Sequence, residues 1–390
     1  MVTVAVIGGG AAGLAAAVSA AKFGAKVTVL ERMDRVGKKL MATGNGRCNL
    51  ANVELNLTHY RGEQQFLNGI FERIGKKEIL DFFRQAGLLF RIENGRIYPL
   101  SNHASAVLDV LRLEAGRYGV RLETDFEVKS VCPRSGGFVI QGAREKVSCD
   151  RLIITTGGKA SPALGSNGSG YEILSSMGHH ITKLYPGLVP MKCEPSQMKG
   201  LRGIRVFAQA SLLMNGKEEA RETGEIQFTD YGLSGIPMLN FSSIVSSYRT
   251  EDVRVKLDLL PGEEDVLKLL QGRDRTHLFT GMFHKQIAQA LCDRTWVPVH
   301  GIQEVDLPAL AKEIKGMTFM VRGTLSWENA QVTVGGAKTA EFQAGTMESL
   351  LVPGLYAAGE VLNVDGDCGG YNLMWAWASG ITAGQEAASV

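Results

Sequence analysis

Three glycines near the start of the chain, Gly8, Gly10 and Gly13, have the spacing G-x-G-x-x-G and follow an apolar run at residues 4–7. This order predicts a buried strand that turns into a helix, with Gly10 where the backbone approaches a pyrophosphate and Gly13 where helix and strand pack. The helix N-terminus would then face the phosphates. Glu31 follows the next apolar run, at the distance expected of an acid that binds a ribose hydroxyl. These residues predict a site for the adenosine half of a dinucleotide; the alternative is a Gly/Ala-rich turn that binds nothing.

A second set of residues with chemical potential lies near the C-terminus, where Gly359 and Glu360 follow an apolar run. An acid after a glycine is suited to bind a ribityl hydroxyl, because the glycine avoids a side-chain clash with the ligand. Gly369 and Gly370 then open a helix whose first N–H groups can stabilise negative charge on the pyrimidine edge of a reduced flavin. Together the two ends of the chain predict two halves of one flavin site.

Trp375, Trp377 and Cys368 lie within the C-terminal motif, and Cys48 lies in a further glycine-rich segment at 37–49. Trp375 and Trp377 are expected in the core of an ordinary buried helix. The six cysteines of the chain form no C-x-x-C pair, so a redox-active disulfide beside the flavin has no support. Cys48 and Cys368 are expected to be small packed thiols, with a position near the flavin as the alternative.

The rest of the composition excludes several other classes of protein. The seven histidines form no H-x-x-x-H or H-E-x-x-H pattern, so no metal site is predicted, and the chain contains no G-x-S-x-G. The net charge of +2 gives no general case for nucleic acid. Basic residues do gather between positions 32 and 77, which we interpret as a solvated face with one or two phosphate contacts; an RNA-binding surface is the alternative.

Residues 1–21 carry no charged side chain, and the first basic residue, Lys22, comes after this apolar stretch rather than before it. That order is unlike a secretory signal, and the glycines within the stretch are unlike a membrane helix. We therefore expect a cytoplasmic protein without a membrane span. No pattern indicates its oligomeric state.

These motifs need an α/β framework to bring them together. Helical spacing covers 76–87 and 104–118, while 119–131, 137–141 and 150–158 are predicted as strands. The last strand ends in small residues, which bring backbone next to a cofactor. The glycine-rich segment 37–49 is predicted to pack its backbone against a ligand, with a mobile surface loop as the alternative.

After Pro186 the character of the chain changes, which predicts an inserted domain. Residues 189–262 are expected to be β-rich, with a hairpin at Asn215 and Gly216, and residues 263–324 to form a helical subdomain. The FAD-binding domain would then be discontinuous and consist of residues 1–188 and 325–390.

Several longer motifs resemble the BaiN/RdsA-like (YhiN-like) flavoproteins, a family of NAD(P)/FAD-dependent oxidoreductases. The resemblance covers nearly the whole chain and is carried by GKKLMATGNGRCN at 37–49, GRIYPLS at 95–101, TVGGAKT at 333–339, TMESLLVPGLYAAGEV at 346–361 and GDCGGYNLMWAWASG at 366–380. It implies a glutathione-reductase-like, Rossmann-type α/β fold close to the fumarate reductase branch, in which an insertion splits the FAD domain.

The motifs and the resemblance together predict one non-covalently bound FAD. Because no second G-x-G-x-x-G follows a strand, NAD(P)H is expected as a hydride donor that binds only transiently. The predicted FAD contacts are Gly8, Gly10, Ala11, Ala12, Gly13, Glu31, Arg32, Lys39, Gly44, Asn45, Gly46, Cys48, Asn49, Val128, Thr156, Gly157, Gly158, Gly359, Glu360, Asp367, Gly370, Tyr371, Asn372 and Leu373.

The expected reaction follows from the cofactor, since a flavin accepts hydride from a nicotinamide and passes it to a second substrate. If the acceptor is an activated C=C bond, an acid must protonate its other carbon. Members of the family are linked to bile-acid intermediates and to uridine in ribosomal RNA, so the substrate is expected to be a small molecule or an RNA base. An oxidase or dehydrogenase that feeds oxygen or a quinone, and an RNA-associated flavoprotein, stay open as alternatives. The conceivable proton donors are Tyr98, Asp230, Tyr231, Cys368 and Tyr371.

Overall fold

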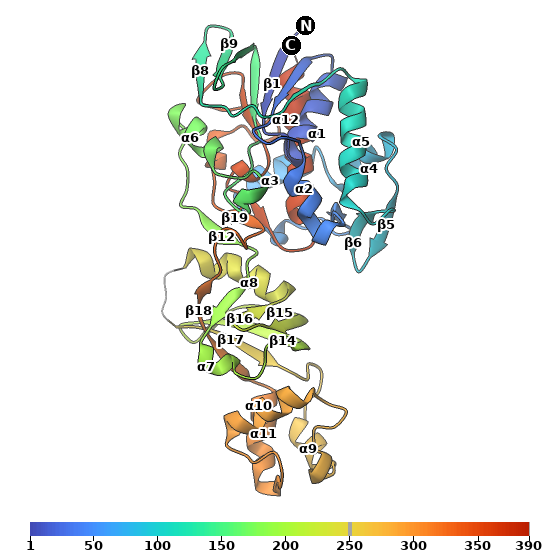
Figure 1. The fold of residues 1–390 in the computed structure, drawn as a ribbon, viewed down its shortest axis with the longest axis vertical. Helices are drawn as coiled ribbons and strands as arrows, with labels where there is room; N and C mark the ends of the chain where they lie inside the picture. The colour runs from blue at the N-terminus through green and yellow to red at the C-terminus, as the bar shows by residue number, and fades with distance from the viewer. Residues whose placement is uncertain (249–251, 390) are drawn as a thin grey trace. The chain divides into compact units, whose positions relative to one another are not determined.

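The computed structural model describes residues 1–248 and 252–389, and the chain forms two compact units (Figure 1). Unit 1 combines Met1–Tyr185 with Gln331–Val390, and unit 2 is Pro186–Ala330. Each unit contains a hydrophobic core of its own. Unit 1 is therefore built from both ends of the chain.

A parallel sheet forms the centre of unit 1, with the strand order β20-β11-β1-β2-β7. Strands of a parallel sheet are buried on both faces and appear in a sequence as short apolar runs, which is why the first two could be predicted. The α/β fold class is thereby confirmed. The strands are β1 (Thr3–Ile7), β2 (Lys26–Leu30), β7 (Arg121–Glu123), β11 (Arg151–Ile154) and β20 (Leu355–Ala357).

Helices α1 (Ala11–Lys22) and α12 (Tyr371–Ala388) pack against each other, although they lie at opposite ends of the chain. Small residues line this contact: a Cβ atom on Gly380 would lie 2.4 Å from the backbone oxygen of Ala12. Close packing of the two backbones leaves no room for larger side chains. The contact brings the two halves of the predicted flavin site into one unit.

Further elements complete unit 1. Its other helices are α2 (Lys38–Ala42), α3 (Gln64–Phe71), α4 (Lys76–Gln85), α5 (Ala104–Arg117) and α6 (Ser169–Ser176). Its small sheets consist of β3 (Ala51–Asn52), β5 (Phe90–Glu93) and β6 (Arg96–Pro99), of β8 (Ser130–Arg134), β9 (Gly137–Gln141) and β10 (Lys146–Cys149), and of β4 (Tyr60–Arg61) with β21 (Asp365–Gly366).

The single strand predicted at 119–131 is wrong. The structure places β7 in the parallel sheet and β8 in a separate antiparallel sheet, and Asp125 between them has a positive φ of 55°. A residue in this left-handed conformation interrupts an extended strand. The change of direction separates two strands whose apolar patterns run together in the sequence.

A closed barrel with the strand order β13-β16-β15-β14-β17-β18 forms the β part of unit 2. The predicted hairpin at Asn215 and Gly216 is confirmed, since both residues have positive φ and join β14 to β15. The strands are β13 (Met191–Cys193), β14 (Arg205–Met214), β15 (Lys217–Phe228), β16 (Gly232–Ser234), β17 (Val253–Asp258) and β18 (Met317–Thr324).

Unit 2 also contains helices. They are α7 (Pro195–Met198), α8 (Ile236–Ser247), α9 (Val266–Gln271), α10 (Lys285–Thr295) and α11 (Leu307–Ile314). One hydrophobic cluster contains buried side chains of both the barrel and these helices, including Val255 and Leu291. Strand β18 pairs with β13 and β17, so the last part of the range 263–324 belongs to the barrel.

The chain leaves and re-enters unit 1 at neighbouring positions. The backbone N–H of Thr182 donates to the carbonyl of Gly336 at 2.9 Å, and the N–H of Gly336 donates to Thr182 Oγ1, also at 2.9 Å. Strands β12 (Tyr185–Gly187) and β19 (Val332–Val334) continue this pairing. The insertion therefore begins and ends at one place on unit 1.

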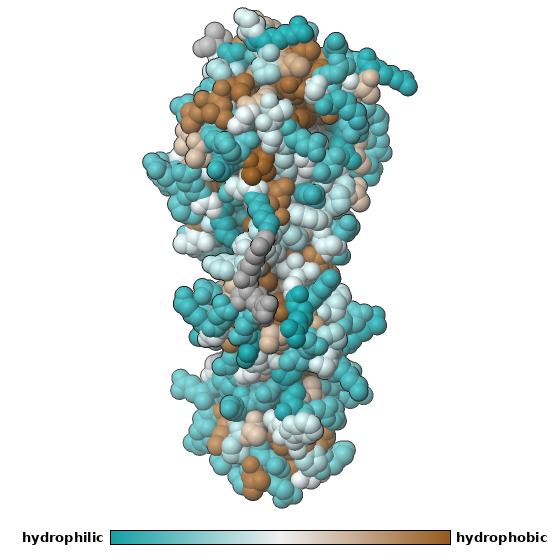
Figure 2. All heavy atoms as spheres, turned by 90° about the vertical axis from the view of Figure 1, so that its left-hand side faces the viewer, coloured by the Kyte–Doolittle hydropathy of each residue, from teal (hydrophilic) through white to brown (hydrophobic). Residues whose placement is uncertain are grey.

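Hydrophilic residues cover most of the face drawn in Figure 2, with separate areas of hydrophobic side chains between them. A folded protein normally leaves some apolar surface exposed. Within residues 1–248 and 252–389, no helix combines the length and the hydrophobicity needed to cross a lipid bilayer.

Candidate functional site

The turn between β1 and α1 has the geometry that the glycine spacing predicts. Gly8 has a φ of 104°, and a Cβ atom on Gly13 would lie only 1.9 Å from the Gly8 carbonyl oxygen, so helix and strand touch through backbone. A Cβ atom on Gly10 would meet no atom of the described chain within 4 Å. Because α1 begins directly after this open position, its first N–H groups are available to a pyrophosphate.

Glu31 directly follows β2, and backbone donors hold its carboxylate in one orientation. Its Oε2 accepts from the N–H of Gly9 at 2.8 Å and its Oε1 from the N–H of Met33 at 2.9 Å. Each carboxylate oxygen keeps a second lone pair, which can accept from a ribose hydroxyl. The predicted contacts Arg32 and Val128 are half-buried residues of the same unit.

Glu360 joins three segments that are distant in the sequence. Its Oε2 lies 2.8 Å from Lys39 Nζ, and its Oε1 accepts from the N–H of Thr333 at 2.8 Å. The fully buried Thr333 in turn accepts from the N–H of Lys159 at 2.7 Å through its hydroxyl. A Cβ atom on Gly158 would lie 2.2 Å from that hydroxyl oxygen. The structure thus brings the predicted contacts Lys39, Gly158 and Glu360 together around Thr333, which the sequence analysis missed as a member of the site.

The glycine-rich segment at 43–49 forms a compact turn in which three predicted contacts, Gly44, Asn45 and Gly46, have positive φ angles. The N–H of Cys48 closes the turn on the carbonyl of Thr43 at 3.0 Å. Burial raises the pKa of the Cys48 thiol to about 12. Cys48 is therefore a packed, protonated thiol rather than a thiolate.

This turn reaches the beginning of α12. A Cβ atom on Gly370 would lie 3.0 Å from Asn49 Oδ1 and 2.7 Å from the carbonyl carbon of Ala51, so only glycine fits there, and its φ of 102° favours glycine as well. Asn372 fixes the first turn from the other side, since its Oδ1 accepts from the N–H of Gly366 at 2.9 Å. Two predicted groups of FAD contacts therefore meet at this helix end.

Both tryptophans of α12 lie in the core, as the sequence indicates. Trp375 and Trp377 are almost completely buried, and their indole N–H groups donate to the carbonyls of Gly359 at 3.1 Å and Leu50 at 3.0 Å. These bonds satisfy the polar end of each ring. They also fix α12 to the Gly359 turn and to the segment after Asn49.

The conceivable proton donors do not form one cluster. Tyr98 on β6 is buried beneath Arg47, whose guanidinium carbon lies 4.2 Å from the ring centre. Tyr371 begins α12, and burial raises the pKa of its phenol to about 12. Cys368 is half-buried three residues before Tyr371. Tyr98, Cys368 and Tyr371 thus share unit 1.

Asp230 and Tyr231 belong to unit 2 instead, where both are exposed at the turn between β15 and β16. Arg202 approaches Asp230 to 4.0 Å. An exposed pair of this kind is weakly held. The flavin motifs and these two donors therefore lie in different units.

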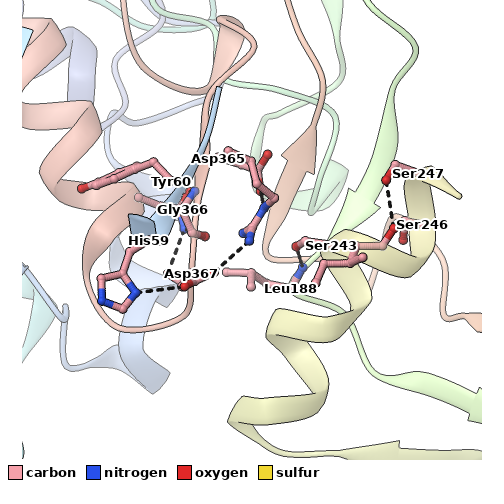
Figure 3. Close-up of polar contacts among 12 residues, drawn as sticks. His59, Tyr60, Leu188, Ser243, Ser246, Ser247, Asp365, Gly366 and Asp367 are labelled. Atoms are coloured by element: carbon pink, nitrogen blue, oxygen red, sulfur yellow. Dashed lines mark hydrogen bonds and ion pairs between the residues drawn. The ribbon is translucent and has the colours of Figure 1, made fainter. Parts of the chain in front are cut away.

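A charged network that the sequence does not predict connects His59, Asp365 and Asp367 (Figure 3). Arg61 Nε donates to Asp365 Oδ2 at 2.7 Å and its Nη1 to Asp367 Oδ1 at 2.8 Å. The other oxygen of Asp367 lies 3.0 Å from His59 Nδ1, and the His59 ring stacks on Tyr371 with centroids 4.3 Å apart. Asp367 is one of the predicted FAD contacts, whereas His59, Arg61 and Asp365 are not among the predicted site residues.

Burial dominates the electrostatics of this network. Asp365 is 2% exposed, and burial raises the pKa of its carboxyl group to about 6, against the opposing effect of Arg61. Within the described part of the chain, the buried Arg61 Nη2 has no hydrogen-bond partner. Arg61 is partly buried, with 32% of its side chain exposed, and the two aspartates hold its guanidinium group in place.

The residues present fit an FAD molecule. Among the described residues, the buried Asn49 Oδ1 has no hydrogen-bond partner, as expected of an atom that faces a ligand. Gly10 borders open space at the start of α1. Glu31, Lys39 and Glu360 supply charged groups at the other predicted contacts.

The chain matches the HI0933-like protein Rossmann domain over residues 2–386. It belongs to this family. The HI0933-like chain is 37% identical over 403 residues to a 3-dehydro-bile acid delta(4,6)-reductase of Clostridium scindens, and the match covers 98% of both chains. It is also 30% identical over 391 residues to a ribosomal RNA dihydrouridine synthase of Haemophilus influenzae, which covers 96% of this chain and 95% of the relative.

A solved structure supports the fold of this HI0933-like chain. The 3-ketosteroid-delta4-(5alpha)-dehydrogenase from Rhodococcus jostii matches with a TM-score of 0.53 and 16% identity, over 99% of this chain and 96% of the other. At this identity the likeness concerns the fold alone. The family match and the curated relatives confirm the predicted FAD-dependent oxidoreductase; contacts of individual residues with FAD stay predictions.

Proposed function

We propose that the protein reduces a C=C bond conjugated to a carbonyl group, using hydride from NAD(P)H and a bound FAD. The observation that carries the proposal is the 37% identity to a bile acid reductase over 98% of both chains. A 3-dehydro-bile acid with double bonds at positions 4 and 6 has such a conjugated system. The proposed substrate is therefore a steroid-like enone or dienone.

The chain's own groups would hold the cofactor from both ends. Glu31 would accept from the ribose, the first turn of α1 would bind the pyrophosphate, and Glu360 with Lys39 would hold the ribityl chain. When bound, FAD accepts hydride from the nicotinamide and delivers it to the substrate. The N-terminus of α12 would stabilise negative charge at the pyrimidine edge.

The cysteines favour direct transfer to an organic substrate over transfer through a thiol pair. None of the six cysteines forms a disulfide, and Cys48, the one in the turn at 43–49, is buried and protonated. A thiol relay needs a thiolate close to a second sulfur. We also propose a cytoplasmic location, where disulfides are rare, because none of the six cysteines pairs with another.

Anaerobic stopped-flow absorbance tests both halves of the reaction. NADH or NADPH should bleach the flavin, and a 3-oxo-4,6-diene bile acid should restore its colour. If neither nucleotide reduces the flavin, but an organic substrate does and a quinone or oxygen then reoxidises it, the protein is instead an oxidase or dehydrogenase. If the flavin is reduced but the dienone leaves it bleached, the substrate class is wrong.

A second candidate substrate is uridine in ribosomal RNA, which the 30% identity to a ribosomal RNA dihydrouridine synthase supports. Uracil also contains a C=C bond conjugated to a carbonyl, so the same proposed chemistry applies. Loss of dihydrouridine from ribosomal RNA in a strain lacking this protein would favour RNA. Tight RNA binding without any dihydrouridine would favour the RNA-associated flavoprotein.

We further propose that different parts of the chain bind the cofactor and select the substrate. Residues 1–188 and 325–390 would bind FAD, while the β-rich part at 189–262 and the helical part at 263–324 would select the substrate. Sequence differences in the insertion should then alter substrate preference and leave the flavin spectrum unchanged. Exchange of the insertion with that of a dihydrouridine synthase, followed by assays on both substrates, tests this division.

A further inference from the structure

His59 carries an imidazole that neither the motifs nor the proposed FAD contacts explain. It ends the short helical turn Leu57–His59, and its side chain is 34% exposed. Its ring lies nearly parallel to that of Tyr371, at an angle of 20° and a centroid distance of 4.3 Å. Tyr371 is the first residue of α12, so the imidazole stands beside the helix end that is proposed to hold the flavin.

Asp367 fixes the orientation of this imidazole. His59 Nδ1 lies 3.0 Å from Asp367 Oδ2, and the backbone N–H of Asp367 donates to the carbonyl of His59 at 2.9 Å. A carboxylate oxygen only accepts hydrogen bonds, so this contact places the proton of a neutral ring on Nδ1. Nε2 is thereby left as the nitrogen that can exchange a proton.

Arg61 and Asp365 hold the carboxylate in turn. Arg61 donates to Asp367 Oδ1 at 2.8 Å and to the buried Asp365 at 2.7 Å, and β4 pairs with β21 at the same residues. The three contacts between basic and acidic side chains all join the segment at 59–61 to the segment at 365–367. The result is an imidazole that a hydrogen-bonded carboxylate holds in one orientation, as is common for histidines that act as general acids.

We infer that His59 is the general acid of the proposed reduction and that Asp367 positions it; this inference rests on the proposed function. Addition of hydride to one carbon of the conjugated bond leaves an electron pair on the neighbouring carbon, the two electrons coming from NAD(P)H through the bound flavin. His59 Nε2–H gives its proton to that carbon, so a C–H bond forms as the N–H bond breaks. The ring, now neutral, recovers a proton from water through its exposed edge.

His59 suits this step better than Tyr371, which was considered above. Burial raises the pKa of the Tyr371 phenol to about 12, which makes it a weak acid near neutral pH. An imidazole is the side chain that enzymes use most often to transfer a proton. The stacked Tyr371 ring would instead restrict rotation of the His59 ring.

The experiment isolates the second half of the reaction. Wild-type holoenzyme and the variants His59→Gln, Asp367→Ala and Tyr371→Phe are reduced with dithionite under argon and mixed with a 3-oxo-4,6-diene bile acid. We expect flavin reoxidation to slow about 100-fold or more in His59→Gln. Reduction of the flavin by NAD(P)H should stay at the wild-type rate, which also shows that the variant is folded and loaded. His103→Gln, at an exposed histidine of the same unit, is the matched control.

A second readout is independent of turnover. In 15N-histidine spectra of the holoenzyme, the neutral His59 ring should carry its proton on Nδ1 in the wild type, and Asp367→Ala should remove this preference. The inference would be overturned if the flavin of His59→Gln were reoxidised at the wild-type rate, or if Tyr371→Phe slowed reoxidation more than His59→Gln does. An Nε2–H tautomer of His59 in the wild type would overturn it as well. If even the wild-type flavin is not reoxidised by the dienone, the proposed function fails first, and this inference falls with it.

Discussion

Gly10 and Gly13 lie in the same turn, yet a methyl group would have different effects at the two positions. At Gly13 it would collide with the Gly8 carbonyl oxygen, whereas at Gly10 it would enter open space. The backbone of Gly10 also has a φ of −82°, which alanine adopts without strain. One glycine thus serves the fold and the other serves the proposed ligand.

Gly10→Ala is expected to weaken FAD binding by about 2 kcal/mol, or about 30-fold, while the free energy of unfolding of the apoprotein changes by less than about 0.5 kcal/mol. Gly13→Ala should instead lower that free energy by about 3 kcal/mol. Flavin fluorescence titration and urea unfolding measure the two quantities. Equal FAD affinity in Gly10→Ala and the wild type would remove the pyrophosphate from this turn.

The cysteines provide a prediction about reactivity. Cys132 is exposed, whereas Cys48 and Cys149 are buried and burial raises the pKa of each thiol to about 12. Only thiolates react quickly with iodoacetamide, so at pH 8 the native protein should be labelled at Cys132 well before Cys48 or Cys149. Peptide mass spectrometry identifies the labelled sites. Rapid labelling of Cys48 would contradict its assignment as a packed thiol, and unfolding in urea should equalise all three.

At the scale of elements, the sequence predicts those parts of the site that depend on local backbone geometry. The glycine turn before α1 and the two tryptophans of α12 could be recognised because spacing and burial reveal them. The network of His59, Arg61 and Asp365 could not, because each contact joins residues more than 300 positions apart. No local pattern contains the information that β4 pairs with β21.

The barrel of unit 2 shows the same limit. Its alternating strands and the Asn215-Gly216 hairpin are local features, and both are visible in the sequence. Closure is different, because β18 pairs with β13 and β17 across the whole helical segment. For this reason β18 was assigned to the helical subdomain. Thr333 was missed likewise, because only the fold brings it to Glu360.

The stability of unit 1 should depend on pH through Asp365, which lies where β21 pairs with β4. The pKa of Asp365 is raised to about 6, so the folded state binds a proton more tightly than the unfolded state. Protonation of the Asp365 carboxyl group contributes about 3 kcal/mol to the free energy of unfolding. This contribution is complete below about pH 4 and is lost as the pH rises through about 6. Asp365→Asn should remove this slope. The free energy of unfolding, measured by urea at several pH values, checks it; parallel curves for both proteins would contradict the raised pKa.

At the scale of the whole molecule, the two separate cores predict two unfolding steps. Unit 1 and unit 2 each bury their own hydrophobic cluster, and the proposed FAD contacts lie in unit 1. FAD at 100 times its Kd stabilises the unit that binds it by about 2.7 kcal/mol. Differential scanning calorimetry should therefore show two transitions, only one of which moves to higher temperature with FAD. A single transition that moves as a whole would contradict independent cores.

The hydrogen bonds between Thr182 and Gly336 have a consequence for how such a protein can change over evolutionary time. Because the two ends of the insertion are tied together on unit 1, the segment between them can lengthen, shorten or be exchanged without opening the flavin domain. The entropic penalty of the loop changes only slowly with its length. Replacement of the inserted segment alone could thus change the substrate during evolution, while the flavin domain and its redox chemistry stay the same.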